Sequence, residues 1–157
     1  MSRTTDSPTF RDLNREEIDE ILTRNNVGRM AYARGNQVDI QPLHYVYSDG
    51  WIYGRTSVGR KLELTGEKWW PVAFEVDEIE DLFRWRSVII HGGFYVIHPD
   101  GPTPEREEYQ RAIGLLRKLI PETRTDDDPT PFRNLVFRIA VQEVTGKAAE
   151  PERTTSP

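Results

Sequence analysis

The chain has no cysteine and only three histidines among its 157 residues. The missing thiols exclude disulfides, iron–sulfur clusters, thiolate zinc sites and cysteine nucleophiles. A metal site built on several imidazoles would need all of His44, His91 and His98. The odd spacing between His91 and His98 puts them on opposite faces of a regular strand. We therefore expect no metal site.

Further absences narrow the function. No stretch approaches the roughly 18 apolar residues of a membrane span, and the first residues are polar, so we expect no membrane segment and no signal peptide and place the protein in the cytoplasm. The net charge of −5 disfavours a nucleic-acid partner. The Gly-x-Ser-x-Gly, His-Glu-x-x-His and Walker patterns are absent, which leaves hydrolases and nucleotide-hydrolysing enzymes without a site.

The ends of the chain differ from its middle. Residues 1–9 and 148–157 are rich in Ser, Thr, Pro and charge and are expected to form flexible tails, so one domain should span 10–147. Within that domain we expect 125–131 (TDDDPTP) to be a solvated loop rather than an acidic metal site. The acidic run 75–81 (EVDEIED) should leave the end of a strand and be solvated as well.

Two helices have recognisable starts. Asn14 as N-cap with Glu17 at the third helical position forms a capping box, and Asn25-Asn26 should end this helix. Thr103-Pro104 opens the second, whose apolar residues recur with helical spacing. A third, short helix is expected over 57–66.

The remaining segments are strand-like and joined by short turns. Arg34-Gly35-Asn36 and Ser48-Asp49-Gly50 are good hairpin turns, and Gly92-Gly93 suggests a bulge that curls the sheet. Short antiparallel strands of this kind predict a mainly β fold, a six-stranded antiparallel split β-barrel with flanking helices. The expected strands are 27–33, 37–47, 51–55, 72–76, 85–98 and 135–145.

Arg55-Thr56-Ser57-Val58-Gly59-Arg60-Lys61 breaks a local rule. If Ser57 caps a helix, Arg60 and Lys61 lie in its first turn, where the helix dipole disfavours cations. A phosphate there would resolve the conflict, because backbone N–H groups, hydroxyls and cations would all donate to it. Gly59 would allow a close approach of the backbone. The alternative is a solvated basic turn.

The segments Val27–Tyr32 (VGRMAY), Ile40–Lys61 (IQPLHYVYSDGWIYGRTSVGRK), Val72–Asp77 (VAFEVD), Trp85–Gly92 (WRSVIIHG) and Val144–Lys147 (VTGK) follow one another along the chain. In this order they resemble the pyridoxamine 5′-phosphate oxidase-like, FMN-binding split-barrel superfamily, and most of all its small members related to nitroimidazole-resistance (Nim-type) flavoproteins. The resemblance covers about Phe10 to Lys147.

The resemblance implies a set of cofactor contacts. The residues that correspond to its phosphate-binding segment are Thr56, Ser57, Gly59 and Lys61, with Arg60 beside them and Arg55 as a less certain extension. The residues that correspond to contacts beside the flavin ring are Pro42, Leu43, His44, Tyr45 and Ser87. Similar proteins are homodimers with the flavin at the subunit boundary, and we expect the same here.

The function that follows from this resemblance is that of an FMN-dependent oxidoreductase. The flavin would carry electrons from a small-molecule donor, such as a reduced nicotinamide, to a small acceptor, and no protein acid is strictly needed. Two alternatives stay open: a flavin-binding module without catalysis, which senses or stores the cofactor, and a split barrel that holds a deazaflavin or heme instead of FMN.

Overall fold

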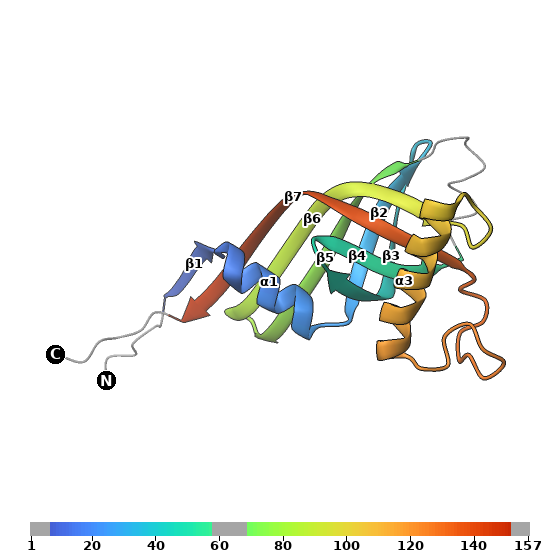
Figure 1. Cartoon of the computed structure of the whole chain (residues 1–157). Coiled ribbons are helices and arrows are strands. Elements are labelled where there is room, and N and C mark those ends of the chain that lie inside the picture. The colour runs from blue at the N-terminus through green and yellow to red at the C-terminus, as the bar shows by residue number, and fades with distance from the viewer. Residues whose placement is uncertain (1–6, 58–68, 152–157) are drawn as a thin grey trace, which may run out of the picture.

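The computed structural model describes residues 7–57 and 69–151. This part of the chain is mainly β, with seven strands and two helices (Figure 1). The elements are β1 (Pro8–Asp12), α1 (Arg15–Arg24), β2 (Val27–Arg34), β3 (Gln37–Ser48), β4 (Trp51–Thr56), β5 (Trp70–Asp81), β6 (Arg84–Ile97), α3 (Thr103–Leu119) and β7 (Leu135–Pro151).

Six of these strands close into a ring. Their order is β7-β4-β3-β2-β5-β6, and β6 pairs back to β7, so every strand of the ring has two neighbours. All pairings are antiparallel. β1 lies outside the ring and pairs with the end of β7. The predicted six-stranded antiparallel barrel is confirmed, with β1 as an additional strand.

Local sequence explains the turns of the meander. The β2–β3 turn contains Gly35 at a φ of 61°, and the β3–β4 turn contains Asp49 and Gly50 at 51° and 78°. Left-handed backbone is readily adopted by Gly and tolerated by Asp, which is why these residues suit tight hairpins. Both hairpins are at the predicted positions.

The pairing of β6 with β7 contains a bulge, and the extra residue, Gln142, is in β7. The pairing register between β6 and β7 shifts between His91 and Gly92. A Cβ atom on Gly92 would lie 1.8 Å from the carbonyl oxygen of Ala140, so only glycine fits at this point. An irregularity thus lies at the predicted position, but the bulged strand is β7, while β6 keeps a regular register with β5 at Gly92-Gly93.

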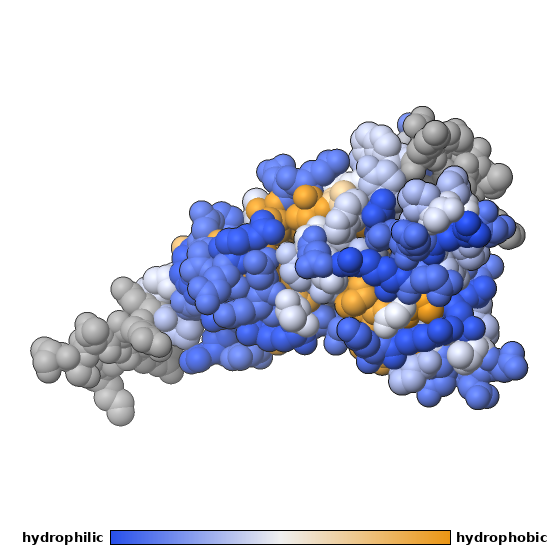
Figure 2. Space-filling view, in the orientation of Figure 1, coloured by the Kyte–Doolittle hydropathy of each residue, from blue (hydrophilic) through white to orange (hydrophobic). Residues whose placement is uncertain are grey.

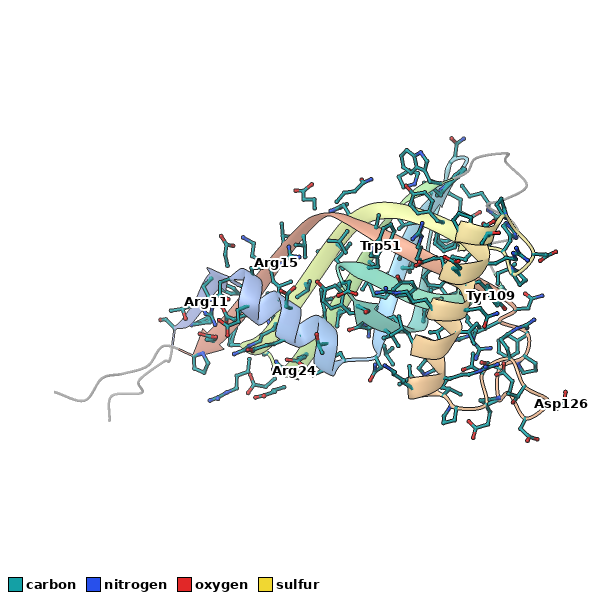
Figure 3. All side chains as sticks on the ribbon, viewed as in Figure 1. Arg11, Arg15, Arg24, Trp51, Tyr109 and Asp126 are labelled. Carbon is teal, nitrogen blue, oxygen red and sulfur yellow. The ribbon has the colours of Figure 1, made fainter. Side chains whose placement is uncertain are left out.

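Each helix covers a different part of the barrel. α1 begins with the predicted capping box of Asn14 and Glu17, and its buried Ile21 and Leu22 join the main core cluster with residues from inside the barrel. The Tyr45 hydroxyl donates to the Leu22 carbonyl oxygen at 2.7 Å, which ties β3 to this helix. α3 instead packs its apolar stripe, including Tyr109, against the outside of β4 and β7 (Figure 3).

The outer surfaces of the helices are polar. In the space-filling view the side of the molecule that carries them is largely hydrophilic, and apolar surface shows mainly where β6 and β7 bend and beside α3 (Figure 2). Within the residues that the structure describes, neither helix is long and apolar enough to cross a membrane.

Several predicted boundaries need correction. Pro8–Asp12 and the end of β7 form a strand pair, and Ala148 and Ala149 are buried, so the ordered region extends beyond 10–147. The acidic run 75–81 does not leave a strand end, because β5 continues to Asp81. Asp128, expected in a solvated loop, is buried. Apart from Ser57, the short helix predicted over 57–66 lies outside the described residues.

Candidate functional site

The end of β4 brings the first predicted site residues together. β4 runs between β3 and β7, and its last residues are Arg55 and Thr56, both buried, followed by the exposed Ser57. The other members of the predicted phosphate segment, Gly59, Arg60 and Lys61, lie outside the described residues.

Arg55 has its charge satisfied within the protein. Its guanidinium nitrogens donate to the two carboxylate oxygens of Asp128 at 2.6 and 3.1 Å, and one of them also donates to the Thr130 hydroxyl at 3.0 Å. The side chains of Arg55 and Asp128 are only 6% and 2% exposed. The Arg55 guanidinium and two backbone N–H donors hold the pKa of the Asp128 carboxyl well below its usual range, although burial opposes them. Arg55 thus anchors the loop between α3 and β7 to β4.

Asp128 was missed by sequence reasoning. A single arginine in a strand among apolar neighbours signals that an acidic partner is needed. The sequence offers Asp126, Asp127 and Asp128 side by side, and nothing in the local pattern distinguishes the buried one from the other two.

The predicted group on β3 divides between two faces. Leu43 and Tyr45 point into the barrel and are 1% and 0% exposed, whereas Pro42 and His44 lie on the outer surface. This alternation follows from the two-residue period of a strand. Only Pro42 and His44 therefore present side chains to a ligand outside the barrel.

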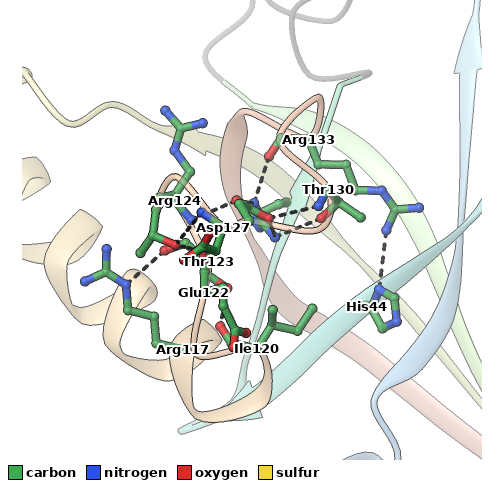
Figure 4. Close-up of polar contacts among 12 residues, drawn as sticks. His44, Arg117, Ile120, Glu122, Thr123, Arg124, Asp127, Thr130 and Arg133 are labelled. Carbon is green, nitrogen blue, oxygen red and sulfur yellow. Dashed lines mark hydrogen bonds and ion pairs between the residues drawn. The ribbon is translucent and has the colours of Figure 1, made fainter.

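Arg133 joins the site although the sequence did not single it out. Its guanidinium NH1 lies 3.4 Å from Nδ1 of His44. Figure 4 shows the side chain extending from the loop before β7 toward β3. Partial burial lowers the pKa of His44, and the positive charges of Arg133 and Arg55 lower it further. His44 is thus kept neutral around physiological pH.

Ser87 lies elsewhere on the outer surface. Its hydroxyl donates to a Glu75 carboxylate oxygen at 3.0 Å, and Arg29 NH1 contacts the other oxygen of Glu75 and the Asp77 carboxylate at 3.2 and 3.1 Å. Burial and the neighbouring Asp77 raise the pKa of Glu75, while Ser87 and Arg29 oppose the rise. Glu75 and Asp77 are thus paired side chains on the barrel wall and not solvated loop residues.

The strand register fixes the separation of His44 from Ser87. Pro42 pairs with Arg29, Arg29 with Glu75, and Glu75 with Ile89, so one row crosses β3, β2, β5 and β6. His44 and Ser87 lie two residues to the same side of this row. They are therefore three strand spacings apart, about 14 Å along the sheet.

This outer face of β3, β2, β5 and β6 carries exposed apolar side chains beside the ion pairs of Arg29, and neither α1 nor α3 covers it. Val38, Ile40 and Ile89 are 76%, 67% and 39% exposed. Ala31 and Ala73 lie between Ile40 and His91 in the row of paired residues. The name open wall is used below for the apolar residues of this face, which are Ala31, Val38, Ile40, Pro42, Ala73 and Ile89. Exposed apolar surface of this kind is typical of an interaction site.

Two tryptophan side chains have partners within the chain. Trp85 packs against Phe10 with ring centroids 6.3 Å apart, and the Trp70 indole donates to the Ala33 carbonyl oxygen at 3.0 Å. Over residues 7–57 and 69–151, no group of His, Asp and Glu side chains is arranged to hold a metal ion.

The fold is a closed six-stranded antiparallel barrel whose outer face carries the candidate site residues Pro42 and His44. The family model described as pyridoxamine 5′-phosphate oxidase matches residues 14–148, and the chain belongs to this family. No curated protein matches the chain.

Solved structures share this fold. A FAD-binding protein from Mesorhizobium loti is 28% identical, with a TM-score of 0.67 over 90% of this chain and 98% of its own. A putative pyridoxamine 5′-phosphate oxidase from Corynebacterium glutamicum is 25% identical, with a TM-score of 0.64 over 92% of this chain and 100% of its own. A putative 5-nitroimidazole antibiotic resistance protein from Bacteroides thetaiotaomicron is 16% identical, with a TM-score of 0.66 over 91% of this chain and 89% of its own. At this identity the likeness supports the fold and nothing further.

Proposed function

We propose that this protein is an oxidoreductase that binds a flavin nucleotide and uses it to transfer electrons. The observation that supports this most is the placement of hydroxyl and cationic donors around the end of β4, directly beside the open wall. The Mesorhizobium loti protein of the same fold is named as FAD-binding, which supports a flavin, whereas FMN remains a prediction from the sequence.

The chain's own residues fit the two chemical halves of a flavin nucleotide. Thr56 and Ser57, together with Gly59, Arg60 and Lys61 of the same segment, would bind the phosphate, because hydroxyls and cations donate to anionic oxygens. Pro42 and His44 would border the ring on the outer surface of β3. The bound flavin would supply the hydride and electron transfer, and the protein would bind and orient it and exclude water from one ring face.

The same proposal includes a homodimer with the flavin at the subunit boundary. His44 and Ser87 of one chain are about 14 Å apart along a curved wall, too far around the barrel for both to border one flat ring. If two copies meet through the open wall, Ser87 of one copy can approach the His44 end of the other. The apolar residues of the wall would then be covered.

The visible spectrum of the purified protein tests the proposal. We expect flavin absorption bands, or their appearance after FMN or FAD is added and excess is removed. The double substitution Ser57→Ala, Lys61→Ala should abolish retention, whereas Lys118→Ala, an exposed lysine of α3, should not. A protein that takes up neither flavin would overturn the proposal.

Anaerobic mixing with a reduced nicotinamide separates an enzyme from a storage or sensing module. Bleaching of the flavin bands, followed by their return on addition of a small nitro compound or quinone, would support electron transfer to a small acceptor. No bleaching with any donor would favour the module. A spectrum with a Soret band instead of flavin bands would identify heme as the cofactor.

A further inference from the structure

Arg133 reaches across the end of β4. Thr56 pairs with Leu135 of β7, so the backbone of Arg133, two residues earlier, lies beside the strand end that holds Ser57. The side chain of Arg133 then extends to His44 on β3, the other neighbour of β4. The Arg133 side chain thus reaches from the loop before β7 to His44 on β3 (Figure 4).

The contact between Arg133 and His44 determines which groups face a ligand. A guanidinium only donates hydrogen bonds, so Nδ1 of His44 must accept, and its proton is on Nε2. Protonation of Nδ1 would place a second positive charge against Arg133. His44 is therefore a neutral side chain whose Nε2–H is a donor. The Arg133 guanidinium, which uses one N–H group in this contact, keeps its other donors for a ligand.

Arg133 also carries the uncompensated charge of this region. Arg55 is neutralised by Asp128, whose oxygens additionally accept from the backbone N–H groups of Arg124 and Thr130. Arg133 forms no ion pair with a carboxylate in the described parts of the chain, and its guanidinium also lies 5.8 Å from the centre of the Phe132 ring. A donor set with one net positive charge suits an anionic oxygen group.

We propose that Arg133, held by its contact with His44, forms a second anion subsite that binds the second phosphate of a dinucleotide flavin such as FAD. This inference rests on the proposed function, which places the first phosphate at Thr56 and Ser57. The two phosphates of FAD share a bridging oxygen, so the second must lie close to the first. The guanidinium of Arg133, which spans β4 beside that position, can bind it with two parallel hydrogen bonds.

The experiment compares the affinities of flavin-free protein for FAD and FMN, measured by quenching of flavin fluorescence. FMN has no second phosphate, so each variant carries its own internal reference. We expect the native chain to bind FAD more tightly than FMN. Arg133→Met should weaken FAD binding by tenfold or more and change FMN binding less than twofold, and Arg133→Lys should restore part of the FAD affinity.

Arg124→Met is the matched control, because Arg124 is an exposed arginine of the same loop whose contact with Asp128 uses only its backbone. It should leave both affinities unchanged. Thermal unfolding of Arg133→Met should match that of the native chain, which separates lost contacts from lost folding.

Four results would overturn the inference in recognisable ways. Equal loss of FAD and FMN binding would place Arg133 at the shared phosphate. Unchanged FAD binding in Arg133→Met would remove the residue from the site, and an effect only on the affinity for a carboxylate or nitro acceptor would assign the subsite to the substrate. If the native chain bound FMN but not FAD, the second subsite would fail while the flavin function stood. Binding of neither flavin would refute the proposed function itself.

Discussion

At the scale of single residues, the buried pair of Arg55 and Asp128 shows how a carboxylate neutralises an arginine next to the proposed ligand site. The pair joins β4 to the loop that carries Arg133. A buried ion pair gives little net stability compared with an apolar pair, but the loss of one partner leaves an unpaired buried charge. The pair therefore acts mainly by fixing the loop.

The first prediction concerns this pair. Asp128→Asn should lower the free energy of unfolding by about 3–5 kcal/mol, because Arg55 keeps its charge in a buried position without a carboxylate. Asp127→Asn, at the exposed neighbouring position, should change it by less than about 0.5 kcal/mol. Urea unfolding at pH 7 measures both. Equal stability of the two variants would contradict the assigned role of Asp128.

The second prediction is the pH dependence of the same pair. The pKa of Asp128 is lowered in the folded protein, so its contribution is fully present above the ordinary aspartate pKa of about 3.9 and is lost as the pH falls below it. The stability difference between the native chain and Asp128→Asn should therefore be constant from pH 5 to 8 and shrink on further acidification. A difference that grew toward low pH would contradict the sign.

Residue-level prediction succeeded where a local rule was at stake and missed contacts between distant segments. Alternation along a strand separates Pro42 and His44 from Leu43 and Tyr45, and this could have been anticipated from the period of two. The position of Arg133 could not be anticipated, because it depends on how the loop between α3 and β7 passes beside the end of β4. The contact with His44 joins residues 89 positions apart.

At the scale of elements, the turns, the helix caps and the barrel itself were predictable, whereas the order of the strands around the ring was not. Asn14 with Glu17, and Gly35 and Gly50 in the hairpins, are short-range signals that fix where elements begin and turn. The pairing of β6 with β7 and the extension of β7 to Pro151 depend on long-range register. The burial of Ala148 and Ala149 could not be predicted without knowing that β1 pairs with this part of β7.

The third prediction tests the bulge that accompanies closure. Gly92→Ala would place a Cβ atom 1.8 Å from the Ala140 carbonyl oxygen, a backbone atom that cannot move aside without disturbing β7. We expect a loss of stability of at least about 2 kcal/mol, measured by thermal or urea unfolding.

Gly114→Ala provides the matched control for this substitution. Gly114 is an exposed position of α3 with open space around its Cβ direction, so alanine should be neutral or raise stability by up to about 1 kcal/mol. A Gly92→Ala protein as stable as Gly114→Ala would show that β6 does not need glycine at the bulge.

At the scale of the whole molecule, the two faces of the barrel differ in a way that a single copy leaves unexplained. α3 covers the outside of β4 and β7, whereas within the described residues no helix lies over the open wall on β3, β2, β5 and β6. The wall also separates His44 from Ser87. Pairing of two copies through this wall would cover the apolar side chains and bring those two site regions together.

The last prediction tests that pairing. Ile40 is 67% exposed in the middle of the open wall, so Ile40→Asp should leave the fold intact and introduce an unpaired charge into the interface. We expect sedimentation to give about twice the chain mass of 18.2 kDa for the native protein and a single chain mass for the variant. Flavin retention should fall when dimerisation is lost, because the ring would lose the side of the site supplied by the second copy.

Leu82→Asp is the matched control, since Leu82 is 78% exposed at the β5–β6 turn and lies outside the wall. A variant at Ile40 that kept both the native mass and the bound flavin would show that the wall is not the interface, while an Ile40→Asp monomer that still bound flavin tightly would show that one copy forms a complete site.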